Sequence, residues 1–168
     1  MSLILSVLEQ GMIYAIMALG IYITYKILDF PDLTVDGSFP MGAALTCVLI
    51  AKGVNPLLTL PVSFLAGVAV GVLTGIIHVK LKVRDLLSGI IMMTALYTVN
   101  LRIAGRANFP IYNYQTIFDN DFVNTIFPVA LKPYRTVIVV LVITLITKYL
   151  LDAYMRTKSG FLLRAVGD

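Results

Sequence analysis

The stretch that decides the fold covers residues 53–77 and reads GVNPLLTLPVSFLAGVAVGVLTGII, without a single charged side chain. A helix needs about 20 apolar residues to cross the roughly 30 Å hydrocarbon core of a membrane. Because that core offers no water, the backbone must satisfy its own hydrogen bonds there. This run is therefore predicted to be a transmembrane helix.

The composition of the whole chain agrees with a membrane location. Of its 168 residues, 59% are hydrophobic and 13% are charged, and the mean hydropathy is +0.92. A soluble domain carries about 25% charged residues, so these values exclude a soluble globule and, equally, a disordered chain. The net charge of +4 lies in loops between apolar segments, which argues against a nucleic-acid partner.

Three other apolar runs, residues 3–25, 86–101 and 136–151, are also predicted to span the membrane. Residues 39–51 are apolar but too few to cross unaided, and they predict a short or re-entrant helix. The runs do not alternate as the strands of a membrane barrel do. The predicted fold class is an all-α integral membrane protein with about four full transmembrane helices, one short or re-entrant helix and a cytoplasmic segment.

Basic residues predict which loops face the cytoplasm, since cytoplasmic loops carry an excess of Lys and Arg. The connection HVKLKVRD at residues 78–85 is rich in these side chains, and so is the tail after the last run, which holds Lys148, Arg156, Lys158 and Arg164 against Asp152 and Asp168. Both are therefore predicted to be cytoplasmic, and the polar loop at residues 104–133 to lie outside. The N-terminus is cytoplasmic if residues 39–51 are re-entrant and outside if they span.

A polar stretch, DFPDLTVDGSFP at residues 29–40, separates two apolar elements. Proline and glycine break regular geometry, and broken backbone at membrane depth is tolerated only where it faces protein or a watery cavity. In transporters such breaks point at the substrate. The stretch thus suggests a solute pathway; the alternative is an ordinary loop before a helix capped by Asp36 or Ser38. The candidate pathway residues are Asp32, Thr34, Asp36, Ser38 and, after the third run, Asn100.

Two further patterns lie on predicted helices. Arg102 and Arg106 are four residues apart and are expected to share a helix face. They indicate either a solute path or side chains that reach the outer headgroups. Gly67, Gly71 and Gly75 are expected to form a helix-packing face, either within the chain or between two copies.

The chain shows no set of residues for catalysis. It has one cysteine and one histidine, which rules out a multi-thiolate or His-rich metal site. It also lacks a phosphate-binding glycine loop and a Ser/His/Asp set. No enzyme activity, catalytic residue, metal or cofactor is predicted. The end of the chain, MRTKSGFLLRAVGD, predicts a short helix with Ser159 as N-cap, which would lie on the membrane surface or dock on a partner.

Several of these segments together resemble the permease subunits of bacterial ABC importers in the branched-chain amino acid and ribose permease family, and within it an amino-acid-type offshoot. The resemblance covers nearly the whole chain and is carried by residues 10–20, 30–38, 42–44, 74–75, 93–97, 100–102, 105–108 and 157–168. The Asp-rich stretch and the basic end are its more specific parts.

The resemblance implies a transport subunit in the bacterial cytoplasmic (inner) membrane, most simply for an amino acid. Its partners would be an ABC ATPase subunit that hydrolyses ATP, an extracellular solute-binding protein and a second permease copy in a homodimer, within the lipid bilayer. Residues 153–168 would begin the cytoplasmic coupling loop. The residues expected to couple to the ATPase are Gly160, Leu163, Arg164, Gly167 and Asp168.

Family members are longer, so residues 1–168 are expected to be a single transmembrane permease domain forming the N-terminal part of a longer, here truncated, permease. Two alternatives remain open from the residues alone. One is a non-enzymatic membrane scaffold that oligomerises through the glycine face, and the other is a permease for a sugar-like solute.

Overall fold

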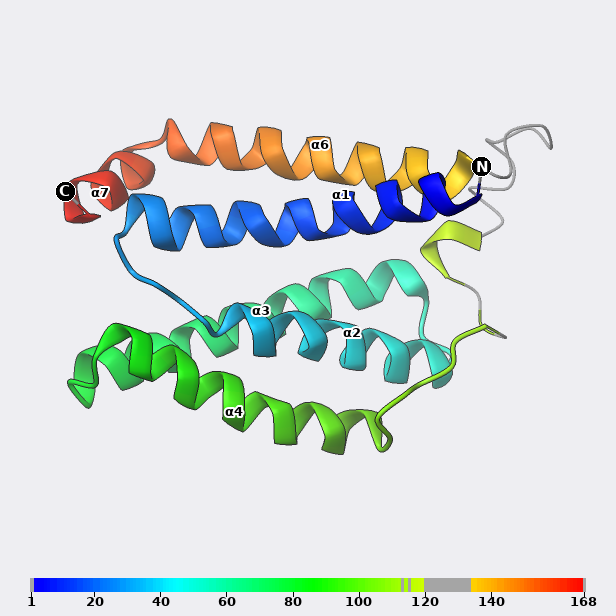
Figure 1. Ribbon diagram of the computed structural model, residues 1–168, viewed down its shortest axis with the longest axis horizontal. Helices are drawn as coiled ribbons and strands as arrows, with labels where there is room; N and C mark the ends of the chain where they lie inside the picture. The colour runs from blue at the N-terminus through cyan, green and yellow to red at the C-terminus, as the bar shows by residue number, and fades with distance from the viewer. Residues whose placement is uncertain (1, 113, 115, 120–133, 168) are drawn as a thin grey trace. The chain divides into compact units, whose positions relative to one another are not determined.

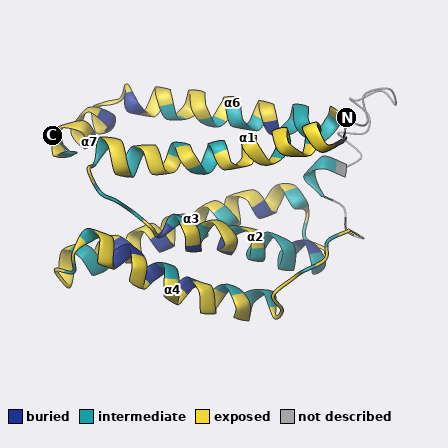
Figure 2. Ribbon diagram, in the orientation of Figure 1, coloured by how far each residue is buried: buried dark blue, intermediate teal, exposed yellow. Residues whose placement is uncertain are grey.

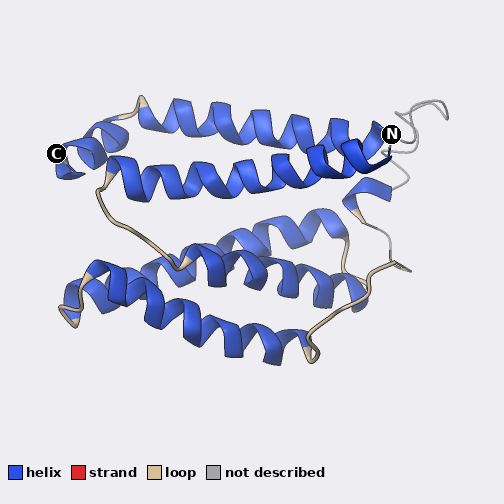
Figure 3. Ribbon diagram, in the orientation of Figure 1, coloured by secondary structure: helices blue, strands red, loops and turns tan. Residues whose placement is uncertain are grey.

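A computed structural model describes residues 2–112, 114, 116–119 and 134–167 of the chain. Within these residues the secondary structure is helical, without strands (Figure 3). The elements are α1 (Ser2–Tyr22), the π-helix η1 (Ile23–Ile27), α2 (Val35–Ala51), α3 (Pro56–Lys80), α4 (Asp85–Ala104), the 3₁₀ turn η2 (Ile117–Asp119), α6 (Arg135–Met155) and α7 (Lys158–Gly167). They form two compact units, one of Met1–Phe30 with Phe118–Asp168 and one of Pro31–Ile117.

Four helices are long and apolar enough to cross a membrane, as the sequence predicts. They are Leu3–Ile27, Pro56–Lys80, Asp85–Ala104 and Arg135–Met155, and at most 22% of any spanning window is buried. Figure 2 shows exposed residues along these helices, and many of them are large apolar side chains. Such a surface is stable in lipid rather than in water, so the predicted fold class is confirmed.

In the first unit, α1 and α6 pack along each other, and α7 contacts both α6 and η1 (Figure 1). The Thr144 hydroxyl lies 3.4 Å from the Met12 carbonyl oxygen across the α1–α6 pair. On α6, Lys148 and Asp152 form an exposed ion pair at 3.7 Å, one helical turn apart.

In the second unit, α2 packs against both α3 and α4. The core between these helices is small and consists of Met41, Val70, Met92 and Leu96. Hydroxyl pairs link the helices as well: Thr34 Oγ1 lies 3.1 Å from Thr74 Oγ1, and Thr46 Oγ1 lies 2.8 Å from Ser63 Oγ. Interhelical hydrogen bonds of this kind contribute about 0.6 kcal/mol each on average in membrane proteins.

The start of α2 corrects one expectation. The helix begins at Val35 rather than near residue 39, so the second half of the polar stretch, residues 35–40, is helical. Thr34 is the N-cap residue, and Asp32 Oδ1 accepts a hydrogen bond from the Thr34 N–H at 2.8 Å in the turn that leads into the helix. The proposal that Asp36 or Ser38 is the N-cap is wrong, because both lie inside the helix.

Candidate functional site

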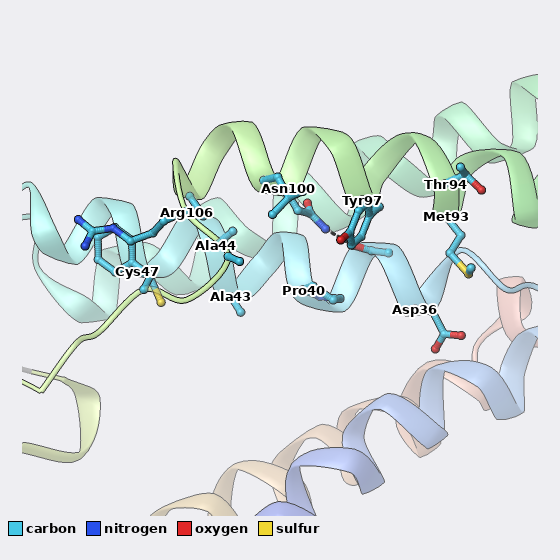
Figure 4. Close-up of a pocket in the computed structure, with 15 residues that line it drawn as sticks. Asp36, Pro40, Ala43, Ala44, Cys47, Met93, Thr94, Tyr97, Asn100 and Arg106 are labelled. Atoms are coloured by element: carbon cyan, nitrogen blue, oxygen red, sulfur yellow. Dashed lines mark hydrogen bonds between the residues drawn. The ribbon is translucent and has the colours of Figure 1, made fainter.

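A cavity of about 610 Å³ lies between α2 and α4, within the unit formed by Pro31–Ile117 (Figure 4). Its lining residues are Asp36, Gly37, Pro40, Ala43, Ala44 and Cys47 from α2, Met93, Thr94, Tyr97, Asn100, Leu101 and Ala104 from α4, and Arg106, Ala107 and Phe109 from the segment after α4. Pockets for small molecules are usually about 300–1,000 Å³, mostly apolar and furnished with a few polar groups. This cavity has those properties.

The α2 wall of the cavity is made of small side chains on one helix face. Gly37, Ala44 and Cys47 follow at spacings close to whole helical turns, which places them in one row. Because the side chains of Ala44 and Cys47 extend little from the backbone, space stays open beside them, whereas α2 and α4 approach closely at Gly37.

The α4 wall is joined to α2 through Asn100. Its amide Nδ2 donates a hydrogen bond to the Gly37 carbonyl oxygen at 2.9 Å. Since a carbonyl oxygen can only accept, the nitrogen of this amide must face it. Asn100 Oδ1 is buried and has no hydrogen-bond partner among the described residues. Buried acceptors in native proteins normally have a partner, so Asn100 Oδ1 keeps an unused acceptor position.

At one end of the cavity stands the carboxylate of Asp36, on the first turn of α2 (Figure 4). The side chain is exposed, and no ion pair or hydrogen bond links its carboxylate to another described residue. Pro40, which also lines the cavity, has no N–H and cannot donate to the Asp36 carbonyl oxygen four residues earlier. This end of the cavity is therefore rich in oxygen acceptors.

At the other end lie Arg106 and Cys47 (Figure 4). The Arg106 guanidinium sits 5.0 Å from the centre of the Phe109 ring, within range of a cation–π interaction. The predicted shared face of Arg102 and Arg106 is wrong, because α4 ends at Ala104 and Gly105 turns the chain in a left-handed conformation with φ +69°. Arg106 thus reaches the cavity from a loop.

A second candidate surface is α7, at the end of the other unit. Its first turn is capped by Thr157, whose Oγ1 accepts from the Gly160 N–H at 3.3 Å, so the expectation of Ser159 as N-cap is wrong. Gly160 is buried against α6, and a Cβ there would lie 2.6 Å from the Met155 backbone. Phe161, Leu162 and Val166 are 61%, 67% and 77% exposed and leave an apolar face uncovered by described residues.

Comparison with known proteins assigns the family. The model of the family described as "branched-chain amino acid transport system / permease component" matches residues 3–168. The chain belongs to this permease family. With its membrane-length helices, the permease is therefore a multi-pass transport protein of the cytoplasmic (inner) membrane.

Two curated relatives are similar to the permease over its full length. It is 42% identical over 168 residues to the "Tyrosine transport system permease protein" of Clostridioides difficile (strain R20291), covering 100% of this chain and 53% of that protein. It is 32% identical over 168 residues to an uncharacterized protein of Rickettsia prowazekii (strain Madrid E), covering 99% and 55%. The chain thus spans about half the length of these relatives. No solved structure matches it significantly.

The permease brings two of its five predicted pathway residues to the cavity, Asp36 and Asn100. The other three do not line it and make local or interhelical bonds instead. Asp32 accepts a hydrogen bond from the Thr34 N–H just before α2, Thr34 is buried against Thr74, and the Ser38 hydroxyl lies 3.4 Å from the Val35 carbonyl oxygen.

Most of the lining residues were not predicted from the sequence, although those of the α2 wall follow a recognisable pattern. Small residues recur along one face from Gly37 to Cys47, but that spacing also suits helix packing. Tyr97 and Phe109 carried no signal beyond their aromatic character.

The predicted packing and coupling residues have distinct surroundings. Cβ atoms built at Gly67, Gly71 and Gly75 meet no described atom within 4 Å, so a role of this face in packing stays a prediction. Among the coupling residues, Gly160 is buried, Leu163 and Gly167 are half-buried and Arg164 is exposed. Asp168 lies outside the described residues.

Proposed function

We propose that the chain is part of the permease subunit of an ATP-driven importer for an amino acid, and that the cavity between α2 and α4 belongs to the solute pathway. The observation that carries this proposal is the cavity itself, which lies between two helices of a chain from a family of transport permeases. A relative named for tyrosine transport supports an amino acid as the solute.

The second part of the proposal concerns the energy source. ATP would be hydrolysed by a separate ATPase, and an extracellular binding protein would deliver the solute to a pair of permeases. The exposed apolar face of α7, with Phe161, Leu162 and Val166, supports a docking role for this helix. Arg164 and Lys158 are exposed on the same helix and add positive charge for an acidic partner surface.

The test is uptake of labelled tyrosine by vesicles that contain the complete transporter. We expect accumulation that requires ATP inside the vesicle and the binding protein outside. A Phe161→Ser permease should lose tyrosine-stimulated ATP hydrolysis, whereas Ser159→Ala, also exposed on α7, should keep it. Absence of ATP-dependent uptake of any amino acid would refute the proposal. Unchanged ATP hydrolysis in Phe161→Ser would refute the role of α7.

A further inference from the structure

The two charged ends of the cavity are too far apart to hold one amino-acid head group between them. Asp36 and Cys47 are eleven residues apart on α2, which at 1.5 Å per residue corresponds to about 16 Å. Arg106 lies at the Cys47 end (Figure 4). In an α-amino acid, the ammonium and the carboxylate are both attached to one Cα through bonds of about 1.5 Å. The head group can therefore bind at only one end of the cavity.

The Asp36 end offers the better site for an ammonium group. It presents the Asp36 carboxylate and the Asp36 carbonyl oxygen, to which Pro40 cannot donate. Both are acceptors, and an ammonium brings three donors. Tyr97 lies between Asp36 and Asn100 on the cavity wall, and its phenol can donate to the attached carboxylate (Figure 4).

The Arg106 end is less suited to the head group. Its guanidinium already stacks on the Phe109 ring at 5.0 Å and repels an ammonium. No carboxylate other than that of Asp36 is found among the lining residues. This end therefore provides no anionic partner for the amino group.

The passage between the two ends is lined by apolar side chains. Ala43 and Ala44 leave room beside α2, and Leu101 and Ala104 cover the facing side. A large apolar or aromatic side chain, which buries about 150–250 Å² when enclosed, would fill this passage. A second carboxylate would be desolvated there without a partner, because it could not reach Arg106.

We infer that the cavity binds an α-amino acid with its ammonium group at Asp36 and a large uncharged side chain lying along Ala44 towards Cys47. This inference rests on the proposed function and adds to it the orientation and the side-chain class of the solute. In it, Asp36 recognises the amino group, and Ala44 limits the size of the side chain.

The experiment follows the reaction of Cys47 with N-ethylmaleimide in the complete permease, without the binding protein, so that only the permease selects the probe. Cys47 is half-buried in the cavity wall, and a Cys47→Ser permease gives the background. We expect tyrosine and tyramine to slow the reaction, and the acid that lacks the amino group, 3-(4-hydroxyphenyl)propionate, and glutamate not to do so. Equal protection by that acid and by tyrosine would overturn the inference.

Two substitutions test the assigned residues. Asp36→Asn should weaken protection by tyrosine about tenfold, as expected when a hydrogen bond to a charged group is lost, and Asp29→Asn, exposed outside the cavity, should not. Ala44→Leu should abolish protection by tyrosine, and an unchanged melting temperature in detergent would show that the variant folds. Ala69→Leu on the exposed face of α3 is its control. Unchanged protection by tyrosine in Asp36→Asn and Ala44→Leu, with ATP-dependent uptake intact, would refute the inference and leave the proposed function standing.

Discussion

Asn100 on α4 donates its amide N–H to the carbonyl oxygen of Gly37 on α2 at 2.9 Å, a bond between residues far apart in sequence. It joins the two helices that enclose the cavity, at the point where Gly37 lets them come closest. A Cβ on Gly37 would lie 2.9 Å from Leu96 Cβ. The same pair of residues therefore holds the cavity walls together and lines the cavity.

The isosteric change Asn100→Asp should destabilise the permease more than truncation to alanine. The carboxylate places an acceptor against the Gly37 carbonyl oxygen, whereas Asn100→Ala removes both the bond and the unpaired Oδ1. We expect a loss of about 1–3 kcal/mol for the aspartate, measured by thermal unfolding in detergent. A melting temperature of Asn100→Asp equal to that of the wild type would show that the bond contributes nothing.

Replacement of Gly37 by alanine should also destabilise the protein. The added methyl group would meet Leu96 and the Met93 backbone at 2.9–3.1 Å, and overpacking of this kind costs about 1–3 kcal/mol. Gly71→Ala is the matched control on α3, where a Cβ meets no described atom within 4 Å. Since alanine favours helix by about 1 kcal/mol over glycine, the control should unfold at the same or a higher temperature. The reverse order would contradict the close approach of α2 and α4.

Pro40 and Pro61 offer a matched pair, because each is the sixth residue of its helix, α2 and α3 respectively. Replacement by alanine restores a backbone hydrogen bond in either helix, and both variants should melt at a higher temperature, by up to about 3 kcal/mol in stability. Only Pro40 lines the cavity. Pro40→Ala should therefore lower tyrosine uptake, while Pro61→Ala leaves it unchanged. Equal uptake in both variants would show that the Asp36 carbonyl oxygen, which Pro40 leaves without its helical donor, plays no part in transport.

The predicted topology places the connection at residues 81–84 and the α7 helix on the same side of the membrane. In a Cys47→Ser background, Lys82→Cys and Ser159→Cys should react with a membrane-impermeant maleimide from the cytoplasmic side only. Both positions are exposed. Reaction of the two cysteines from opposite sides would contradict the charge-based orientation.

The four spanning helices were predicted well from the sequence, because a long uncharged run in a membrane can satisfy its backbone hydrogen bonds by forming a helix. The beginning of α2 was predicted poorly. Asp36, Gly37 and Pro40 each favour a turn when judged singly, yet the helix begins at Val35, ahead of all three, with Thr34 as its N-cap residue.

The site was harder to predict than the fold. Asp36 and Asn100 could be singled out because polar groups at membrane depth are costly. Ala43, Ala44 and Cys47 could not, because a small apolar residue has the same appearance in a packed helix interface and in a cavity wall. Arg106 reaches the cavity because α4 ends at Ala104 and Gly105 turns the chain. Helical periodicity alone does not predict where a helix ends.

The central claim is that solute passes through the cavity between α2 and α4. It is tested most directly by attaching a blocking group to Cys47, which lines this cavity. The purified permease is reacted with N-ethylmaleimide, modification of Cys47 is confirmed by mass spectrometry, and the transporter is reassembled in vesicles. We predict loss of ATP-dependent tyrosine uptake in the wild-type permease and unaffected uptake in Cys47→Ser treated in the same way. Full uptake by a permease with completely modified Cys47 would contradict the claim.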